Sequence, residues 1–176
     1  MSVFKILICS FLFLSSFAND LIFTKNDKVV VKIKLQDLKS GRLKIGDYYI
    51  GSLDKTLFNA WRAYERTYRG YNFFELLDAV YGADWKKAKT INFKATDGYK
   101  QIANIKRMLD SSKGKQGYIS YTETGKDGFT FYKRKEKIID PGPIYLVWSN
   151  FSGEDKASHG DNLKWPYMLE TINIKE

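Results

Sequence analysis

Cysteine and histidine are almost absent from this sequence of 176 residues, which has one of each, Cys9 and His159. A lone cysteine excludes a disulfide-stapled scaffold. The shortage of thiols and imidazoles also excludes Cys/His zinc sites, iron–sulfur clusters, covalently attached haem and the usual Ser-His-Asp or Cys-His catalytic groups. Proline is scarce as well, with 3 residues, and the 13 glycines are scattered, so collagen-like and low-complexity chains are excluded.

Apolar, aromatic and basic residues, by contrast, are plentiful. Hydrophobic residues make up 44% of the chain and aromatic residues 16%, which excludes disorder and indicates one globular domain with a real core. The formal net charge is +9. Spread charge of this kind is typical of a solvated surface, but it also suits an acidic partner, an anionic ligand or a membrane surface. No nucleic-acid reader motif is present, so we expect no nucleic acid partner.

The N-terminus predicts export. Lys5 precedes a short apolar run over residues 6–14, and Ser16 and Ala18 form a small-x-small end, which is typical of a secretory signal peptide over residues 1–18. An uncleaved membrane anchor is the alternative, but the run is too short to span a hydrocarbon core of ~30 Å. We therefore expect a periplasmic protein, with secretion as the second choice and no transmembrane segment after cleavage.

The remaining chain divides into a short lead over residues 19–28 and a single domain over residues 29–176. Alternating apolar residues and turn signals predict strands at 29–35, 43–50, 91–95, 118–122, 129–132, 144–148 and 168–174. Helical spacing predicts helices at 54–65 and 73–81 and a helical turn near 102–109. The strands at 118–122 and 129–132 are expected to form a hairpin, and 151–162 a polar loop. The pattern favours an α+β fold, mostly β, with a mixed sheet and a few short helices.

A series of short motifs follows in a characteristic order. Its members are Tyr68-Arg69-Gly70-Tyr71, a Phe-Glu-Leu-Leu-Asp segment, a strand ending in Asp97-Gly98-Tyr99, a Gly-Tyr-Ile-Ser-Tyr strand, Pro141-Gly142-Pro143 before an apolar strand, and Trp165-Pro166-Tyr167. This order resembles the molybdopterin-binding domain of the sulfite oxidase family, in its small periplasmic branch. The resemblance implies a sulfite oxidase-like fold. It also implies a c-type cytochrome as a separate partner, because some members of that branch carry one as an additional module.

Two departures from the family pattern bear on chemistry. Family enzymes hold molybdenum through a cysteine thiolate, but the corresponding segment here, residues 57–64, contains no cysteine. A soft thiolate has no equivalent among those side chains. The arginine that the resemblance implies after the Gly-Pro motif is Tyr145. We therefore expect no functional molybdenum centre, no metal site and no catalytic residue, with binding of molybdopterin without the protein thiolate as a minority view.

The resemblance and the aromatic residues together give a set of pocket candidates: Tyr68, Arg69, Asp97, Gly98, Tyr99, Tyr145, Trp148, Trp165 and Tyr167. A structural interpretation stands beside each of them. Asp97-Gly98-Tyr99 also fits a tight turn that needs glycine. The aromatic residues near the C-terminus also fit core packing. His159 fits an exposed loop position.

Three functions follow from these observations. The first is a redox-associated module without a molybdenum centre, acting beside a c-type cytochrome or another acidic redox protein. The alternative is a non-catalytic envelope protein that binds an anionic ligand or a protein partner. An active molybdopterin-dependent oxidoreductase is the minority view, since the missing thiolate favours a non-enzymatic role.

Overall fold

The computed structural model describes residues 20–160 and 162–176. The expected signal peptide over residues 1–18 lies outside the described residues. Strands account for 45% of the described residues and helices for 21%. The chain is therefore an α+β protein that is mostly β, as its sequence predicts.

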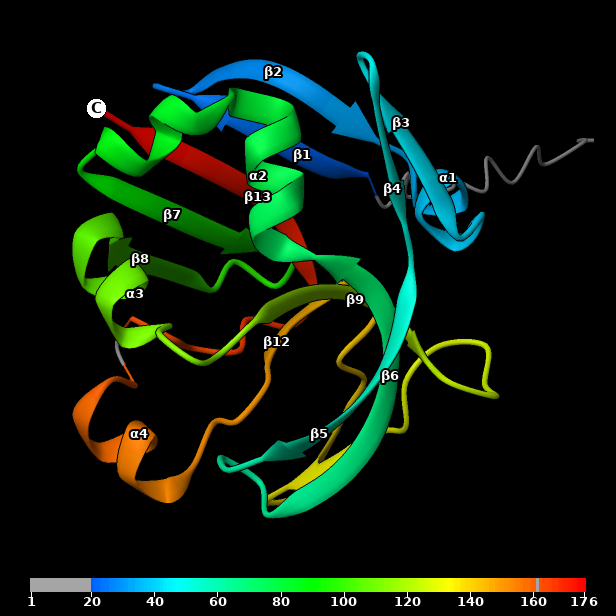
Figure 1. Ribbon diagram of the computed structural model, residues 1–176. Helices are drawn as coiled ribbons and strands as arrows, with labels where there is room; N and C mark the ends of the chain where they lie inside the picture. The colour runs from blue at the N-terminus through cyan, green and yellow to red at the C-terminus, as the bar shows by residue number, and fades with distance from the viewer. Residues whose placement is uncertain (1–19, 161) are drawn as a thin grey trace, which may run out of the picture.

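A five-stranded mixed sheet occupies the upper part of the molecule in Figure 1. Its strands, in spatial order, are β2 (Lys28–Ile33), β1 (Leu21–Lys25), β13 (Leu169–Lys175), β7 (Thr90–Ala95) and β8 (Lys100–Asn104). Strands β1 and β13 run parallel, and the other neighbours are antiparallel. The sheet is therefore mixed, and the two ends of the described chain meet in it.

A four-stranded antiparallel sheet forms the second layer. Its order is β12 (Tyr145–Trp148), β9 (Gly117–Glu123), β6 (Tyr64–Asn72) and β5 (Leu53–Asn59). Strands β5 and β6 form a strongly curved ribbon in the lower part of Figure 1. Two separate hairpins pair β3 (Arg42–Ile45) with β4 (Tyr48–Gly51) and β10 (Tyr132–Arg134) with β11 (Lys137–Ile139).

The helices are short: α1 (Leu35–Lys39), α2 (Phe73–Tyr81), the 3₁₀ helix η1 (Ala83–Lys87), α3 (Ile105–Ser111) and α4 (Gly153–Ser158). Helix α2 confirms its sequence prediction. The Asn72 side chain accepts hydrogen bonds from the N–H groups of Phe74 and Glu75, and Gly82 ends the helix with a φ of 69°.

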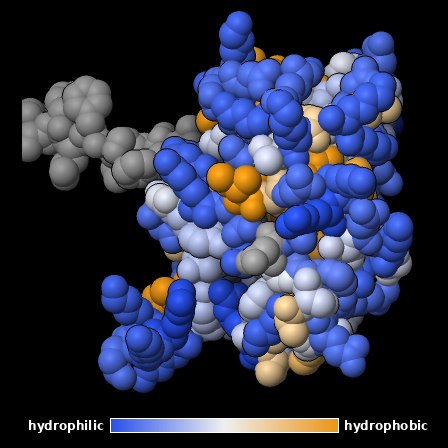
Figure 2. All heavy atoms as spheres, turned by 90° about the vertical axis from the view of Figure 1, so that its left-hand side faces the viewer, coloured by the Kyte–Doolittle hydropathy of each residue, from blue (hydrophilic) through white to orange (hydrophobic). Residues whose placement is uncertain are grey.

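The core lies where α2 packs against both sheets. Trp148 is 1% exposed and lies edge-on to Phe73 and Phe74, with ring centroids 6.0 and 5.9 Å apart. Edge-to-face aromatic pairs of this kind add to the free energy gained by burying apolar surface. Figure 2 shows that the side of the molecule at the left of Figure 1 is mostly hydrophilic, with apolar side chains in small separate patches.

Two sequence predictions fail near the start of the chain. The short lead expected over residues 19–28 contains β1 in its described part, and β1 lies between β2 and β13 with Leu21 and Phe23 fully buried. The helix expected over 54–65 is instead the β5–β6 hairpin. Its turn is closed by the Asn59 side chain, which accepts hydrogen bonds from the N–H groups of Trp61 and Arg62 at 3.0 and 3.2 Å.

Three other local predictions are wrong. Strand β9 pairs with β6 and β12, so the hairpin expected between 118–122 and 129–132 does not form. The β10–β11 hairpin takes its place. The segment 151–162 contains α4, which begins with a capping box between Ser152 and Asp155. The strand expected at 43–50 is the β3–β4 hairpin, whose turn includes Gly46 at a φ of 56°.

Candidate ligand-binding site

A hollow of about 700 Å³ opens at one end of the two sheets. Four segments line it, drawn from residues 61–64, 97–99, 132–134 and 164–167. They belong to the β5–β6 turn, the β7–β8 turn, the β10–β11 hairpin and the stretch that leads into β13. A volume of this size is typical of a site for a small molecule.

The wall of the hollow is aromatic and basic. Its aromatic side chains are Trp61, Tyr64, Tyr99, Tyr132, Trp165 and Tyr167. Its basic side chains are Arg62, Lys133, Arg134 and Lys164, and among the described residues Asp97 is the one carboxylate in the lining. The described wall therefore favours a ligand with negative charge and a flat apolar part.

Arg62 is held in place by two tyrosines from distant parts of the chain. Its Nη1 donates a hydrogen bond of 2.7 Å to the Tyr145 hydroxyl, and its Nη2 donates to the Tyr132 hydroxyl. The guanidinium carbon also lies 3.8 Å from the centre of the Tyr132 ring and 5.4 Å from that of Tyr167. Within residues 20–160 and 162–176, no carboxylate forms an ion pair with Arg62.

The two tyrosines do not neutralise this charge. Burial raises the pKa of Tyr145 above its usual range, although Arg62 and Asn59 act in the opposite direction. Burial and the neighbouring Tyr167 raise the pKa of Tyr132 to about 12, against the opposing effect of Arg62. Both phenols therefore remain protonated at neutral pH, and the half-buried guanidinium keeps a full positive charge.

The wall also contains unsatisfied hydrogen-bond donors. The indole Nε1 atoms of Trp61 and Trp165 are buried and have no hydrogen-bond partner among the described residues. Trp61 stacks on Phe151 at a centroid distance of 5.8 Å, and Trp165 meets the edge of Tyr145 at 6.0 Å. An unpaired buried N–H costs about 1–3 kcal/mol.

The structure brings five of the sequence candidates to the hollow. Asp97, Tyr99, Trp165 and Tyr167 line it. Tyr145 is fully buried and reaches the site through its hydrogen bond to Arg62. The Arg62 guanidinium that lies beside Tyr145 comes from the β5–β6 turn.

The turn interpretation of Asp97-Gly98-Tyr99 also holds. Gly98 has a φ of 88°, and the Asp97 carboxylate accepts a hydrogen bond of 3.0 Å from the Tyr99 N–H. Such a turn fixes the two side chains that flank the glycine. The structural and the functional interpretation of this segment are therefore compatible, because the same turn places Asp97 and Tyr99 in the lining of the hollow.

Three sequence candidates lie away from the lining. Tyr68 is 2% exposed and packs edge-on against Tyr145 at 6.0 Å. Trp148 belongs to the core. Arg69 is exposed and forms a two-point ion pair with Asp54, at 2.8 and 2.9 Å.

Most of the lining residues that the sequence analysis missed come from the β5–β6 turn and from β10, and Lys164 and Pro166 come from the stretch that leads into β13. Arg62 lay in a segment interpreted as a helix, so nothing indicated that its side chain faces a pocket. The run Tyr132-Lys133-Arg134 carried a usable signal, since an aromatic residue beside consecutive cations suits an anionic ligand.

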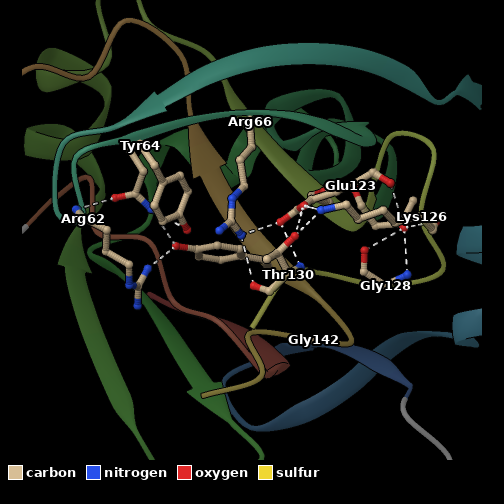
Figure 3. Close-up of polar contacts among 12 residues, drawn as sticks. Arg62, Tyr64, Arg66, Glu123, Lys126, Gly128, Thr130 and Gly142 are labelled. Carbon is tan, nitrogen blue, oxygen red and sulfur yellow. Dashed lines mark hydrogen bonds and ion pairs between the residues drawn. The ribbon is translucent and has the colours of Figure 1, made fainter. Parts of the chain in front are cut away.

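A second polar cluster lies beside Arg62 and holds the loop that leads to β10. The Glu123 carboxylate accepts hydrogen bonds from Arg66 at 2.6 Å, from the Thr130 hydroxyl at 2.6 Å and from Lys126 at 2.9 Å. Figure 3 shows Tyr64 and Arg66 between this cluster and Arg62, and the Arg66 guanidinium lies 4.0 Å from the centre of the Tyr64 ring. The cluster supports the wall rather than forming part of it.

The donor set does not suit a molybdenum centre of the kind that sulfite oxidase family enzymes hold. Among the described residues, no three His, Cys, Asp or Glu side chains lie together in a way that would hold a metal ion. The described lining offers four cationic side chains against one carboxylate, and no thiolate. The positive charge of these side chains disfavours binding of a metal cation. The described lining also lacks the soft thiolate ligand through which such a centre holds its molybdenum.

Comparison with models of known protein families gives no match, and no curated protein sequence matches the chain at a significant level. In the part of the chain that the structure describes, no helix has the length and apolar character needed to cross a membrane.

Proposed function

We propose that this protein is a non-catalytic binding module for a small anionic ligand that carries a planar ring. The observation that carries the proposal is Arg62, a half-buried guanidinium whose fixed donors meet two neutral phenols and no described carboxylate. A buried charge without a counter-ion is costly. An anionic group beside Arg62 would remove this cost and form charge-assisted hydrogen bonds.

The rest of the wall supports a flat ligand. The rings of Tyr132 and Tyr167 stand perpendicular, with centroids 6.2 Å apart at 89°, and the indoles of Trp61 and Trp165 line the same hollow. Flat aromatic surfaces bind planar rings by stacking and edge contacts. Among the described lining residues there is no serine, threonine, cysteine or histidine, so the proposal is binding rather than nucleophilic catalysis.

Substitution of Arg62 tests this proposal. Phenyl phosphate, which joins a ring to a dianion, should bind the mature chain and change its tryptophan fluorescence, whereas neutral phenol should bind far more weakly. Arg62→Gln should weaken phenyl phosphate binding by about tenfold or more, because hydrogen bonds to charged groups contribute about 1.5–3 kcal/mol. Isothermal titration calorimetry would give the dissociation constants.

Arg69→Gln is the matched control, because Arg69 is a sequence candidate that lies outside the lining. It should leave the dissociation constant unchanged, and both variants should be compared at the same fraction folded. Equal affinity for phenol and phenyl phosphate would contradict the proposal, as would an Arg62→Gln variant that binds like the wild type.

A second candidate function is the redox-associated role, with a sulfite oxidase-like fold and a periplasmic location. It rests on the motif order and the net charge of +9, and the mixed sheet with few helices is compatible with it. The protein purified from its own envelope fraction should contain no stoichiometric molybdenum, although a metal-free pterin phosphate would belong to the ligand class proposed above. Stoichiometric molybdenum by elemental analysis would instead restore the oxidoreductase view.

The redox role also predicts a partner. An acidic c-type cytochrome should be retained on the immobilised protein at low salt and released at high salt, since the attraction between exposed charges is screened. Passage of the cytochrome without retention at low salt would remove this candidate and leave the ligand-binding module.

A further inference from the structure

The β10–β11 hairpin exposes apolar side chains among cations. Ile138 is 74% exposed, the largest fraction among the large apolar side chains of the described residues, and Phe131 is 59% exposed. Four basic residues lie between them, Lys133, Arg134, Lys135 and Lys137, with Glu136 as the single acidic residue. In Figure 1 the hairpin, in yellow, lies at the lower end of the molecule near the β5–β6 turn.

Alternation along the strands gives this hairpin two different faces. Its cross-strand pairs are Tyr132 with Ile139, Lys133 with Ile138, and Arg134 with Lys137. Neighbouring side chains along a strand point to opposite faces. Tyr132 and Ile139 therefore share one face, the one on which Tyr132 accepts a hydrogen bond from Arg62 at the hollow. Lys133 and Ile138 share the other face, although Lys133 also lies in the lining of the hollow. Phe131, one residue before β10, follows the same alternation as Lys133.

The charge of this hairpin is not neutralised within it. Glu136 lies 3.9 Å from Lys133, and both side chains are largely exposed, at 95% and 70%. Exposed pairs at this distance contribute little and are screened by salt. Residues 131–139 therefore present a net charge of +3, from four cations and one carboxylate, beside two apolar side chains with more than half of their surface in water.

We propose that the outer face and tip of the β10–β11 hairpin bind the surface of an anionic lipid bilayer. Phe131 and Ile138 insert between the headgroups, and Lys135 and Lys137 contact the lipid phosphates. Apolar side chains flanked by cations are the combination that holds proteins at an anionic interface. The proposal does not depend on the ligand in the hollow, because these four side chains are not part of its lining.

The size of the hairpin favours a bilayer over an acidic protein. Each strand has three residues, and the hairpin region offers two large exposed apolar side chains, Phe131 and Ile138. A specific protein interface buries about 800 Å² on each partner, which is more than the tip of one such hairpin offers. A bilayer needs no matching shape, and a few inserted side chains with nearby cations suffice for reversible binding.

Vesicle flotation tests the proposal with the mature chain, which is the chain without the expected signal peptide. The protein should float with vesicles of phosphatidylcholine containing about 30% phosphatidylglycerol and should not float with pure phosphatidylcholine. Phe131→Ser/Ile138→Ser should lower the partition coefficient by about tenfold or more, since each apolar side chain loses its burial in the interface. Lys135→Gln/Lys137→Gln should lower it as well, and 0.5 M NaCl should release the wild type.

The matched control is Ile102→Ser/Lys100→Gln on β8, which removes an isoleucine that is 62% exposed and a cation on another edge of the molecule. This variant should float like the wild type. No flotation of the wild type, or an equal loss in the control, would overturn the proposal. Retention on an acidic protein column through Phe131 and Ile138, without flotation, would overturn it in favour of a protein partner.

Discussion

Replacing Glu123 with alanine should lower the free energy of unfolding by about 3–5 kcal/mol, as expected when one partner of a buried ion pair is removed. Glu123 is 4% exposed, and its carboxylate lies 2.6 Å from Arg66 Nη1. It also accepts hydrogen bonds from Lys126 and from both the N–H and the hydroxyl of Thr130. Without it, the half-buried Arg66 guanidinium and the donors of Thr130 lose their main acceptor.

The measurement is urea-induced unfolding followed by circular dichroism, with Glu136→Gln as the control. Glu136 is 95% exposed on its side chain, so its replacement should change the free energy of unfolding by less than about 0.5 kcal/mol. A Glu123→Ala variant within about 1 kcal/mol of the wild type would contradict the role assigned to this cluster.

The same carboxylate predicts a dependence of stability on pH. Burial alone would raise the pKa of Glu123, but the hydrogen bonds from Thr130, Lys126 and Arg66 outweigh it and lower the pKa below the ordinary 4.5. The folded state therefore binds this proton less tightly than the unfolded state. The stabilisation is complete above about pH 4.5 and is lost as the pH falls through the folded-state pKa. Glu123→Gln should lack this part of the acid destabilisation.

Sequence reasoning succeeded where local signals and burial agree. The helix over 73–81 has a capping asparagine, a buried apolar stripe and a terminal glycine. The strands predicted at 91–95, 144–148 and 168–174 match β7, β12 and β13, whose apolar side chains are buried. In each case the residues that determine the type of helix or strand are also the residues buried on its inward face. The local sequence and the tertiary packing therefore favour the same structure.

The missed elements depend on contacts that a local pattern does not contain. The β5–β6 turn has helix-like spacing, but Asn59 and Arg62 bond to Tyr145, 86 and 83 residues away. The second hydrogen bond of Arg62 goes to Tyr132, 70 residues away. The sequence therefore did not indicate Arg62, the central residue of the proposed site, whereas turn and aromatic motifs marked Asp97 and Trp165, which line the hollow, as candidates.

Gly70 is the position at which alanine should be least tolerated. It lies in β6 at an irregularity in the register with β9, between Arg69 and Gly70. A Cβ atom there would lie 2.4 Å from the Ile119 carbonyl oxygen and 2.7 Å from the Ser120 Cα. Both atoms belong to the backbone of a central strand, so no side-chain rotation relieves the contact. Gly70→Ala should therefore force β6 and β9 apart and lower the free energy of unfolding by about 3 kcal/mol or more.

Gly51→Ala in β4 is the matched control, since a Cβ at that glycine meets nothing within 4 Å. It should change the free energy of unfolding by less than about 0.5 kcal/mol, and the comparison needs only the urea midpoints and slopes of the two variants. A tolerated alanine at position 70 would show that β6 and β9 are less closely packed than the structure has them. A large loss of unfolding free energy would explain the glycine of Tyr68-Arg69-Gly70-Tyr71 by the close approach of two strands. The residues before it also have structural roles, since Tyr68 is buried in the core and Arg69 pairs with Asp54 outside the hollow. That motif would then bear on the fold, and the search for the ligand would stay with Arg62 and the aromatic wall.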